Sequence, residues 1–473
     1  MSGNADLREV DVAIIGAGSA GLFAMAQVRR HTENFVLIDG GELGTTCARV
    51  GCMPSKVLIQ VAEDFQRRKL FEREGIDGAD ELSVDSEAVM EHVQDLRDVF
   101  VDKTLATTDN LGPEHLIEAP ARFVSADTLQ AGEQRIRAKS IIIATGSTPI
   151  VPAAWREFGE RIITTDNFFE LESLPSAMAV VGLGIIGLEI GQALNRLGVE
   201  VTAFDQLSTL AGLRDAVVNE QVVNIIGREM TIHLGEPARV EAEGGQLRVS
   251  AGEHSVVVDR VFVSMGRRPN LEALDLHKAG IAVDANGVPS YDPHSMRIGD
   301  SAIFIAGDVN ADRPLLHEAG HEGRVAGLNA ARLVRGEAVL RFQRKTPLAI
   351  TFCDPNIATV GASLDALDES EIAIAEIPFG PVSRALMIGK NRGILRLYVA
   401  KSDGRLLGAA LACVKGEHLA HLLAWSIQQG MTVFDMLKMP FYHPVVEEAL
   451  QAALYSVLSE LAVKQEWVEL QAQ

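Results

Sequence analysis

The stretch VAIIGAGSAG, residues 12–21, decides the fold class of this chain. Four apolar residues of strand type lead into a glycine-rich turn, which an apolar helical stretch follows. A second apolar run, residues 35–38, then ends in Asp39. In a Rossmann unit of this order, the glycines let the backbone approach a pyrophosphate at the positive end of the helix, and the acid accepts the ribose hydroxyls. The stretch therefore predicts a dinucleotide-binding site.

The same pattern returns much later as AVVGLGIIG, residues 179–187, followed by a helix and by a strand-like run that ends in Asp205. In both copies the first glycine and the closing acid are 23 positions apart. One such motif is weak support, but two copies, each between a strand and a helix and each closed by an acid, are strong support. Two dinucleotide sites on one chain predict a flavin together with a nicotinamide cofactor.

The length and the charge of the chain narrow the class of protein. Its 473 residues are too many for one hydrophobic core and favour about three domains. The formal net charge of −21 argues against nucleic acid and against anionic membrane surfaces, because both need a basic face. The polar N-terminus lacks the apolar core of a signal peptide, and the apolar runs are of strand length. We expect a cytoplasmic protein without a membrane-spanning segment.

A closely spaced pair of cysteines follows the first glycine motif in GTTCARVGCMPSK, residues 44–56. No metal site is expected, because no second Cys/His pair with fitting spacing stands near. The proline of the segment fits an early helical position, and a helix N-terminus depresses the pKa of a thiol. The pair Cys47 and Cys52 is therefore interpreted as a reversible redox dithiol, with two buried structural thiols as the alternative. Cys353 and Cys413 are isolated and are interpreted as buried small hydrophobic residues.

Together with the two glycine motifs, residues 44–56 resemble the active-disulfide segment of the class I pyridine nucleotide–disulfide oxidoreductase family, most of all its dihydrolipoamide dehydrogenase branch. The resemblance covers essentially the whole chain. It implies an α/β fold with two Rossmann-like dinucleotide-binding domains, for FAD and NAD, and an α+β C-terminal dimerisation domain. The implied divisions are an FAD-binding domain at 1–150, an NAD-binding domain at 151–272, a central segment completing the FAD site at 273–346, and an interface or dimerisation domain at 347–473.

The same resemblance implies the roles of the redox residues. Cys47 would be the interchange thiol that attacks a substrate disulfide, and Cys52 would face the flavin ring and exchange electrons with it through a thiolate–flavin charge-transfer state. Lys56 would lie by the flavin N5 and pair with Glu189; the alternative for both residues is an ordinary surface charge. The implied cofactor-binding residues are Gly16, Gly18, Gly21, Asp39, Thr46, Lys56, Thr145, Gly146, Gly182, Gly184, Gly187, Asp205, Gly266, Gly307 and Asp308.

His443 is the candidate acid–base residue, because dithiol exchange needs a proton acceptor and histidine titrates in the useful range. Pro444 can start a helix just after it, so that a glutamate of the first turn can orient the imidazole. The family pattern maps this orienting role onto Glu448 and not onto Glu447; the alternative is a structural helix cap. In the family this histidine enters the active site of the neighbouring subunit, which implies a homodimer.

Further features concern the nicotinamide nucleotide and the substrate. Asp205 would repel the extra phosphate of NADP, and residues 206–209 supply no cation, which favours NAD. Residues 184–189 and 315–319 resemble the lipoamide branch. Because there is no cysteine-rich domain at the start and no cysteine near the C-terminus, mercuric reductase and large thioredoxin reductase are not expected. Arg49 stands where the lipoamide branch commonly has asparagine; it is hypothesised to stabilise a thiolate or attract an anionic substrate, unless it points to solvent or pairs with an acid.

The resemblance predicts an enzyme in which dihydrolipoyl thiols, free or on a carrier protein, reduce a Cys47–Cys52 disulfide and the electrons reach NAD through FAD. One alternative is an NAD(P)H-dependent reductase of another disulfide. A second alternative is a flavin-bearing subunit that binds lipoyl domains with little turnover. Phe441 stands where the lipoamide branch often has a second histidine, a departure that concerns the substrate and not the chemistry.

Overall fold

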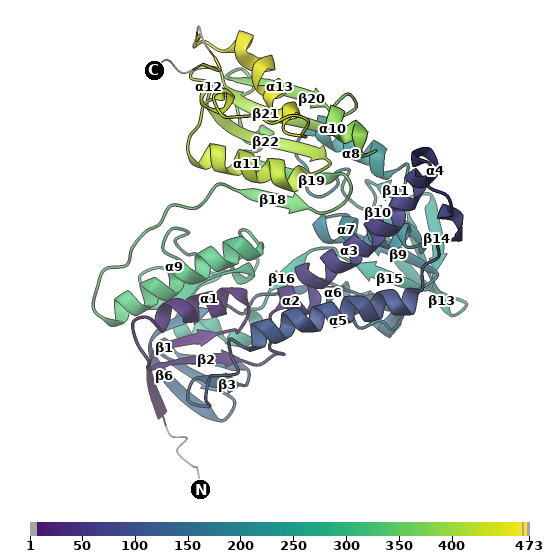
Figure 1. The fold of residues 1–473 in the computed structure, drawn as a ribbon. Coiled ribbons are helices and arrows are strands. Elements are labelled where there is room, and N and C mark those ends of the chain that lie inside the picture. The colour runs from purple at the N-terminus through teal and green to yellow at the C-terminus, as the bar shows by residue number, and fades with distance from the viewer. Residues whose placement is uncertain (1–6, 466–467, 471–473) are drawn as a thin grey trace.

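The computed structural model describes residues 7–465 and 468–470. Figure 1 shows three bodies, with the N-terminal strand in the lowest and the C-terminal helices in the highest. We call them the first body, built on the N-terminal sheet, the second body, residues 150–266, and the third body, from residue 348 onward. No helix in this described part of the chain is long and apolar enough to cross a membrane.

The first body is built on a largely parallel sheet of order β3-β2-β1-β6-β5-β4, in which β17 also pairs with β6. The two halves of β6 show why the sheet has this form. Its first half alternates exposed and buried residues against antiparallel β5, whereas its isoleucine end is wholly buried between parallel neighbours. The strands are β1 (Leu7–Ile15), β2 (Phe35–Asp39), β3 (Leu116–Glu118), β4 (Ala121–Ser125), β5 (Thr128–Ala131), β6 (Gln134–Ile143) and β17 (Ile303–Ile305).

Two helices from distant parts of the chain, α1 (Ser19–Val28) and α9 (Leu316–Val334), pack against each other beside this sheet (Figure 1). Glycines let them approach closely, since a Cβ atom at Gly323 or Gly327 would clash with the backbone of α1. The chain after residue 300 therefore completes the first body.

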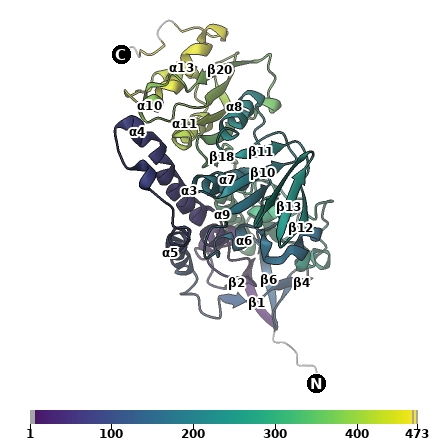
Figure 2. The same cartoon turned by 90° about the vertical axis from the view of Figure 1, so that its right-hand side faces the viewer.

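Another group of helices follows the first Rossmann unit and crosses the middle of the molecule. Figures 1 and 2 agree that α3 lies beside α7 of the second body. The buried positions of α3 include Leu58 and Ala62, one turn apart, so one apolar stripe faces its neighbours. The helices are α2 (Thr46–Val50), α3 (Cys52–Arg67), α4 (Phe71–Glu74) and α5 (Ser86–Leu105).

The second body repeats the Rossmann pattern in a parallel sheet of order β11-β10-β9-β15-β8. A three-stranded antiparallel sheet, β12-β13-β14, accompanies it. The elements are α6 (Thr165–Phe168), α7 (Ile185–Arg196), α8 (Ala216–Ile226), β8 (Ile162–Ile163), β9 (Ala177–Val181), β10 (Glu200–Asp205), β11 (Thr231–Leu234), β12 (Arg239–Glu243), β13 (Gln246–Ala251), β14 (His254–Val258) and β15 (Arg260–Val263).

The chain enters and leaves the second body through a two-stranded antiparallel ribbon of β7 (Ser147–Pro149) and β16 (Arg267–Pro269). Arg267 lies opposite Pro149, and Pro269 lies opposite Ser147. The second body is therefore an insertion between two parts of the first.

The third body is an antiparallel sheet of order β18-β19-β22-β21-β20 packed with helices. The predicted fold class, two Rossmann-like units and an α+β C-terminal domain, is confirmed; the predicted domain boundaries stay predictions. The elements are β18 (Leu348–Thr351), β19 (Asn356–Gly361), β20 (Ile372–Pro378), α10 (Ser383–Met387), β21 (Ile394–Ala400), β22 (Leu406–Cys413), α11 (Gly416–Gln428), α12 (Val433–Leu437) and α13 (Glu448–Val457).

Candidate active site

The two predicted glycine motifs have matching geometry. The first glycine of each, Gly16 or Gly182, has a positive φ of 106° or 97°, and a Cβ atom there would clash with a carbonyl group at the end of a neighbouring strand. The third, Gly21 or Gly187, faces the carbonyl oxygen of the first so closely that a Cβ atom would clash with it too. These four positions accept only glycine because the strand, the turn and the helix meet there.

The second glycine of each motif has the opposite environment. A Cβ atom at Gly18 or Gly184 would meet nothing within 4 Å. Each of these residues is the N-cap of a helix, α1 or α7, whose first N–H groups receive no side-chain cap. Open space beside an uncapped helix N-terminus is what the pyrophosphate of a dinucleotide requires.

The closing acids of the two motifs also make matching bonds. Asp39 accepts a hydrogen bond from Ala17 N–H at 2.5 Å and another from Gly41 N–H at 2.8 Å. Asp205 makes the same two bonds, at 2.5 and 2.8 Å, to the N–H groups at the equivalent positions of the second motif. Each carboxylate therefore ties its own glycine loop to the strand end from which it projects.

A cleft of about 670 Å³ runs along the first motif. It adjoins a cavity of about 190 Å³, and several residues line both spaces, among them Gly18, Thr46 and Gly146. Cys47 and Cys52 line the smaller cavity, so the cleft leads from the glycine loop to the two cysteines. The predicted residues that line one or both spaces are Gly16, Gly18, Asp39, Thr46, Thr145, Gly146, Gly307 and Asp308. A cleft with an uncapped helix N-terminus at one end and two thiols at the other has a lining that fits an extended dinucleotide.

The later motif of the cleft, Gly307 and Asp308, is held by a buried acid. Glu322 of α9 is fully buried and accepts hydrogen bonds from Gly307 N–H at 2.8 Å and from the Asn310 side chain at 2.6 Å. Burial raises the pKa of Glu322. Asp308 itself accepts a bond of 3.2 Å from the Ser147 hydroxyl. This network sets the position of Asp308 in the cavity.

Two other predicted residues lie at the ribbon between the first and second bodies. The Thr145 hydroxyl donates to the Asn270 carbonyl at 2.7 Å, and the Asn270 amide donates back to the Thr145 carbonyl at 3.0 Å. Gly266 has a φ of 101°, and its carbonyl accepts a bond from Ile150 N–H at 3.0 Å. Gly266 does not line the cleft or the thiol cavity, so the structure places this predicted cofactor-binding residue at the ribbon.

The two cysteines influence each other's titration. Cys47 lies in α2, Cys52 is the first residue of α3, and both are free thiols. The neighbouring Cys47 thiol is the largest cause that lowers the pKa of Cys52 to about 6; the Lys56 cation lowers it further, against burial and the Glu189 charge. The neighbouring Cys52, together with burial, raises the pKa of Cys47. Of the two thiols, Cys52 is therefore the one whose surroundings favour the thiolate.

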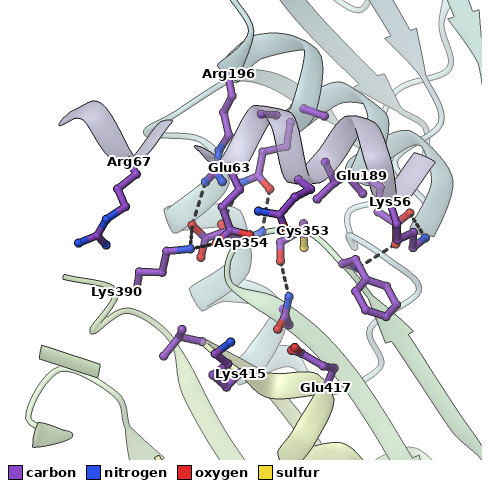
Figure 3. A pocket seen from close by; sticks show the side chains of 18 of the residues that line it. Lys56, Glu63, Arg67, Glu189, Arg196, Cys353, Asp354, Lys390, Lys415 and Glu417 are labelled. Atoms are coloured by element: carbon purple, nitrogen blue, oxygen red, sulfur yellow. Dashed lines mark hydrogen bonds and ion pairs between the residues drawn. The ribbon is translucent and has the colours of Figure 1, made fainter. Parts of the chain in front are cut away.

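The predicted partners Lys56 and Glu189 are brought together from α3 and α7 (Figure 3). Lys56 Nζ lies 2.7 Å from Glu189 Oε2, and only 3% of the Glu189 side chain is exposed. The other carboxylate oxygen, Oε1, accepts a bond of 2.8 Å from the Phe352 N–H. Lys56 also lies 4.9 Å from the centre of the Phe352 ring, a distance that suits a cation–π contact. All three bodies therefore meet at this ion pair.

The predicted pair His443 and Glu448 forms on the third body. His443 Nδ1 lies 2.8 Å from Glu448 Oε1, and Glu448 Oε2 accepts a bond of 3.2 Å from Val445 N–H. These bonds lower the pKa of the Glu448 carboxyl. Among the described residues, those that line the thiol cavity do not include His443, and its side chain is 75% exposed.

One expectation about this segment is wrong. The helix α13 begins at Glu448 and not at Pro444, because residues 444–447 form a turn. The Glu448 carboxylate binds both His443 and the Val445 N–H, which holds the turn in place before the helix begins. The glutamate still belongs to the first helical turn, as expected.

Arg49 pairs with an acid, which was the alternative to the hypothesis that it acts on a thiolate or a substrate. Its guanidinium binds both the carboxylate and the main-chain carbonyl of Glu42, the latter at 3.2 Å. Both residues line the dinucleotide cleft, and neither lines the thiol cavity. The cation that acts on Cys52 is Lys56.

Several residues of the site were missed from the sequence. Glu322 carried a signal, because a carboxylate on the apolar face of an amphipathic helix needs a buried partner. Arg267 lines both the cleft and the thiol cavity and donates to Ser147 Oγ at 2.8 Å, but an arginine at the start of a short strand gives no such signal. Gln192 and Asp354, described below, also carried no signal in the sequence.

The fold and the site define a class of protein: an oxidoreductase with two Rossmann-like units, a paired-thiol centre between them and an α+β C-terminal domain. Residues 10–323 match the pyridine nucleotide-disulphide oxidoreductase family, and residues 348–454 match its dimerisation domain. The chain belongs to this family, whose members depend on FAD and a nicotinamide nucleotide. The resemblance seen in the sequence is thereby confirmed.

The relatives of this chain are named for different substrates. The chain is 29% identical over 461 residues to dihydrolipoyl dehydrogenase of Geobacillus stearothermophilus, which covers 94% of this chain and 96% of the relative. It is 27% identical over 439 residues to mercuric reductase of Staphylococcus aureus, which covers 90% of this chain and 79% of the relative. Identities this similar do not separate the two substrates.

Solved structures agree in fold. The HOCl-induced flavoprotein disulfide reductase RclA from Escherichia coli, solved as a Cu(II) complex, superimposes with a TM-score of 0.82 at 22% identity, covering 95% of this chain and 100% of its own. LpdA from Mycobacterium tuberculosis gives a TM-score of 0.81 at 22% identity with the same coverage. Both likenesses extend over nearly the whole chain.

Proposed function

We propose that this protein oxidises dihydrolipoyl groups with NAD, through FAD and a redox disulfide between Cys47 and Cys52. The observation that carries the proposal is the pair of free thiols at the inner end of the dinucleotide cleft, beside the Lys56 cation, which lowers the pKa of Cys52. Structural thiols would have no need of a neighbouring cation or of a cleft built for a dinucleotide. The pair is placed to exchange electrons in both directions.

The steps of exchange follow from the different environments of the two sulfurs. A substrate thiolate attacks Cys47 Sγ of the disulfide, so that a substrate–Cys47 bond forms and the Cys47–Cys52 bond breaks. Cys52 leaves as a thiolate, which its low pKa favours. The second substrate thiol loses its proton and attacks the substrate sulfur bound to Cys47, which releases the substrate as a disulfide and leaves Cys47 reduced. Two electrons have then moved from the substrate to the cysteine pair.

The cofactor-binding residues would retain the group that removes these electrons. Gly16, Gly18, Gly21 and Asp39 would hold the pyrophosphate and ribose of FAD, with Asp308 along the same cleft. A bound FAD supplies the chemistry that links a dithiol to a hydride acceptor. For the acceptor we propose NAD, because a carboxylate at Asp205 disfavours the phosphate of NADP.

His443 is the proposed acceptor of the substrate proton. Because Glu448 binds Nδ1, the imidazole is oriented with Nε2 as the nitrogen that can exchange a proton. His443 is exposed and does not line the thiol cavity of its own chain, which supports a homodimer in which each subunit supplies this residue to the other. The cytoplasmic location expected from the sequence stays a prediction.

The proposal is tested by anaerobic stopped-flow spectroscopy of the purified protein with bound FAD. Dihydrolipoamide is the reductant, NAD is the acceptor, and Cys47→Ser is the matched control. We expect a rapid long-wavelength absorbance from the Cys52 thiolate beside the flavin, followed by NADH, and no NADH from Cys47→Ser. If NADH reduces the flavin but dihydrolipoamide does not react, the redox chemistry stands and the lipoyl substrate is wrong.

The second candidate function is an NADH-driven reductase of a different disulfide. It is favoured by the relatives, since a mercuric reductase and a disulfide reductase stand beside the dihydrolipoyl dehydrogenases. Transfer of a metal through extra thiols is disfavoured, because Cys353 and Cys413 are only 2% and 0% exposed. Oxidised glutathione and cystine, tried with NADH in the same instrument, distinguish this candidate from the lipoyl one.

A further inference from the structure

A short segment of the third body, residues 352–354 between β18 and β19, lies directly behind the Lys56–Glu189 pair. We call it the clamp segment. Three side chains of α7 bind it, namely Glu189, Gln192 and Arg196, and their spacing of three and four residues puts them on one face of the helix. Glu189 makes the first contact by accepting the Phe352 N–H.

Gln192 makes the second contact with both ends of its amide. Its Oε1 accepts the Asp354 N–H at 2.8 Å, and its Nε2 donates to the Asp354 carbonyl at 2.8 Å. Arg196 makes the third contact, with 3.1 Å between its guanidinium and Asp354 Oδ2. Gln192 is 3% exposed and the Arg196 side chain is 4% exposed, so these bonds are shielded from water. Buried bonds of this kind hold their partners more firmly than exposed ones.

Cationic side chains from several elements surround the Asp354 carboxylate (Figure 3). Besides Arg196, it faces Arg392 at 3.3 Å and Lys390 at 3.6 Å, and Lys390 also binds Glu63 of α3. Although burial opposes ionisation, these cations hold the pKa of Asp354 below its usual value. The clamp segment therefore joins α3, α7 and the third body at one charged centre.

A cavity of about 400 Å³ makes this clamp necessary. Lys56, Glu189, Phe352, Asp354 and Lys390 all line it, and 33% of the Lys56 side chain is exposed. A lysine beside open space loses rotamer freedom when it is held in one position, so a defined position has to be imposed by its partner. The partner, Glu189, is itself fixed by the Phe352 N–H on its far side.

We propose that the clamp segment is a positioning element: it fixes the Glu189 carboxylate, and through it the Lys56 ammonium one helical turn from Cys52, so that the third body sets the geometry of the thiol centre. The inference rests on the proposed redox role of Cys52. Since the lowering effect of Lys56 on Cys52 outweighs the raising effect of Glu189, release of both side chains raises the pKa of the thiol.

The test is a pH titration of the Cys52 thiolate in the reduced protein with bound FAD. It is followed by the long-wavelength thiolate–flavin absorbance and by the rate of reaction with iodoacetamide. Gln192→Met removes both amide bonds to Asp354, together with a bond of 3.2 Å to Glu229, and leaves Lys56, Glu189 and Asp354 in place. We expect its titration midpoint to rise by about half a pH unit, which is about a threefold loss of thiolate below the midpoint. Asp354→Asn is the second variant and is expected to shift the midpoint in the same direction.

The matched control is Asp365→Asn. It breaks the ion pair between Arg214 and Asp365, at 2.8 Å, which joins the same two bodies on the surface and does not touch Glu189. We expect no shift in this control. The proposal is overturned if Gln192→Met and Asp354→Asn fold and titrate like the control. It is also overturned if neither folds, because the segment then serves stability alone. The titration needs no substrate, so a failure of the lipoyl assignment would leave its result intact.

Discussion

The thiol centre and the His443–Glu448 pair serve the same proposed reaction but are built differently. At the thiol centre, the Glu189 side chain is 3% exposed and all three bodies contribute bonds. At the His443–Glu448 pair, the side chains are 75% and 33% exposed, and both come from one segment of the third body. The electron-transferring part is therefore fixed within one chain, whereas the proton-transferring part is presented outward.

This difference in exposure shows what fixes the positions of the reacting groups in each part. An exposed ion pair gains little in water, so the bond from Glu448 orients His443 only weakly while both remain solvated. The same bond strengthens when a covering surface removes water from it. The Glu189 carboxylate does not need such a cover, because it is already packed between α3, α7 and the clamp segment. The outward pair needs a second surface, which the proposed homodimer would supply.

The largest expected effect separates the two parts. His443→Gln should lower turnover of dihydrolipoamide about 100- to 10,000-fold, because it removes the general base. Bound FAD and the Cys52 titration should not change, since His443 does not line the thiol cavity. Glu447→Gln is the control, because the adjacent Glu448, not Glu447, holds the imidazole.

Mixed dimers sharpen this prediction. Coexpression of His443→Gln chains with Cys47→Ser chains should restore part of the activity that neither variant has alone, because one of the two sites in a mixed dimer would keep both of its parts. Steady-state rates of the purified heterodimer measure this. A heterodimer as inactive as its parents would mean that His443 serves its own chain or has no role in turnover.

An intermediate effect is expected from Lys56→Met at the thiol centre. Removal of the cation should raise the pKa of Cys52 from about 6 by about one unit, because a nearby positive charge favours the thiolate. At pH 6 the reduced variant should then hold less thiolate, and above pH 9 it should match the unaltered protein. The rate of alkylation between pH 5 and 9 measures the shift. An unchanged midpoint would show that Cys47, and not the Lys56 cation, depresses the pKa of Cys52.

The smallest effect is expected from Arg49→Asn. Arg49 is tied to Glu42 beside the dinucleotide cleft, so its loss should weaken retention of FAD by less than about fivefold, the range of a partly exposed ion pair. Substrate preference and the pH profile should stay the same. Flavin absorbance after dialysis and rates with dihydrolipoamide and a more acidic dithiol measure both. A changed substrate preference would restore the hypothesis that Arg49 meets the substrate.

The features predicted from the sequence are those with short, fixed spacings. The two glycine motifs and their closing acids form one local unit each, so periodicity and spacing were sufficient to predict them. The contact between His443 and Glu448 spans five residues and follows the family pattern. Lys56 and Glu189 meet across 133 residues, and only the resemblance placed them together.

The features that escaped prediction depend on long-range packing. Gln192 and Asp354 are 162 residues apart, and neither belongs to a motif. The predicted start of α13 was wrong because the Glu448 carboxylate accepts a hydrogen bond from the Val445 N–H. This bond keeps the turn from joining the helix. The partner of Arg49 depended on the path of the loop that carries Glu42, which no periodicity describes.

The ribbon of β7 and β16 has a consequence for how such a molecule can be changed. Both crossings of the chain between the first and second bodies run side by side in it, with Arg267 opposite Pro149. The second body is thus joined to the first at two neighbouring points of the chain. It can be replaced without interrupting the sheet of the first body or the segment that carries the thiols. An exchanged unit would leave the thiols in place but would have to supply its own partner for Lys56, because Glu189 lies in the second body.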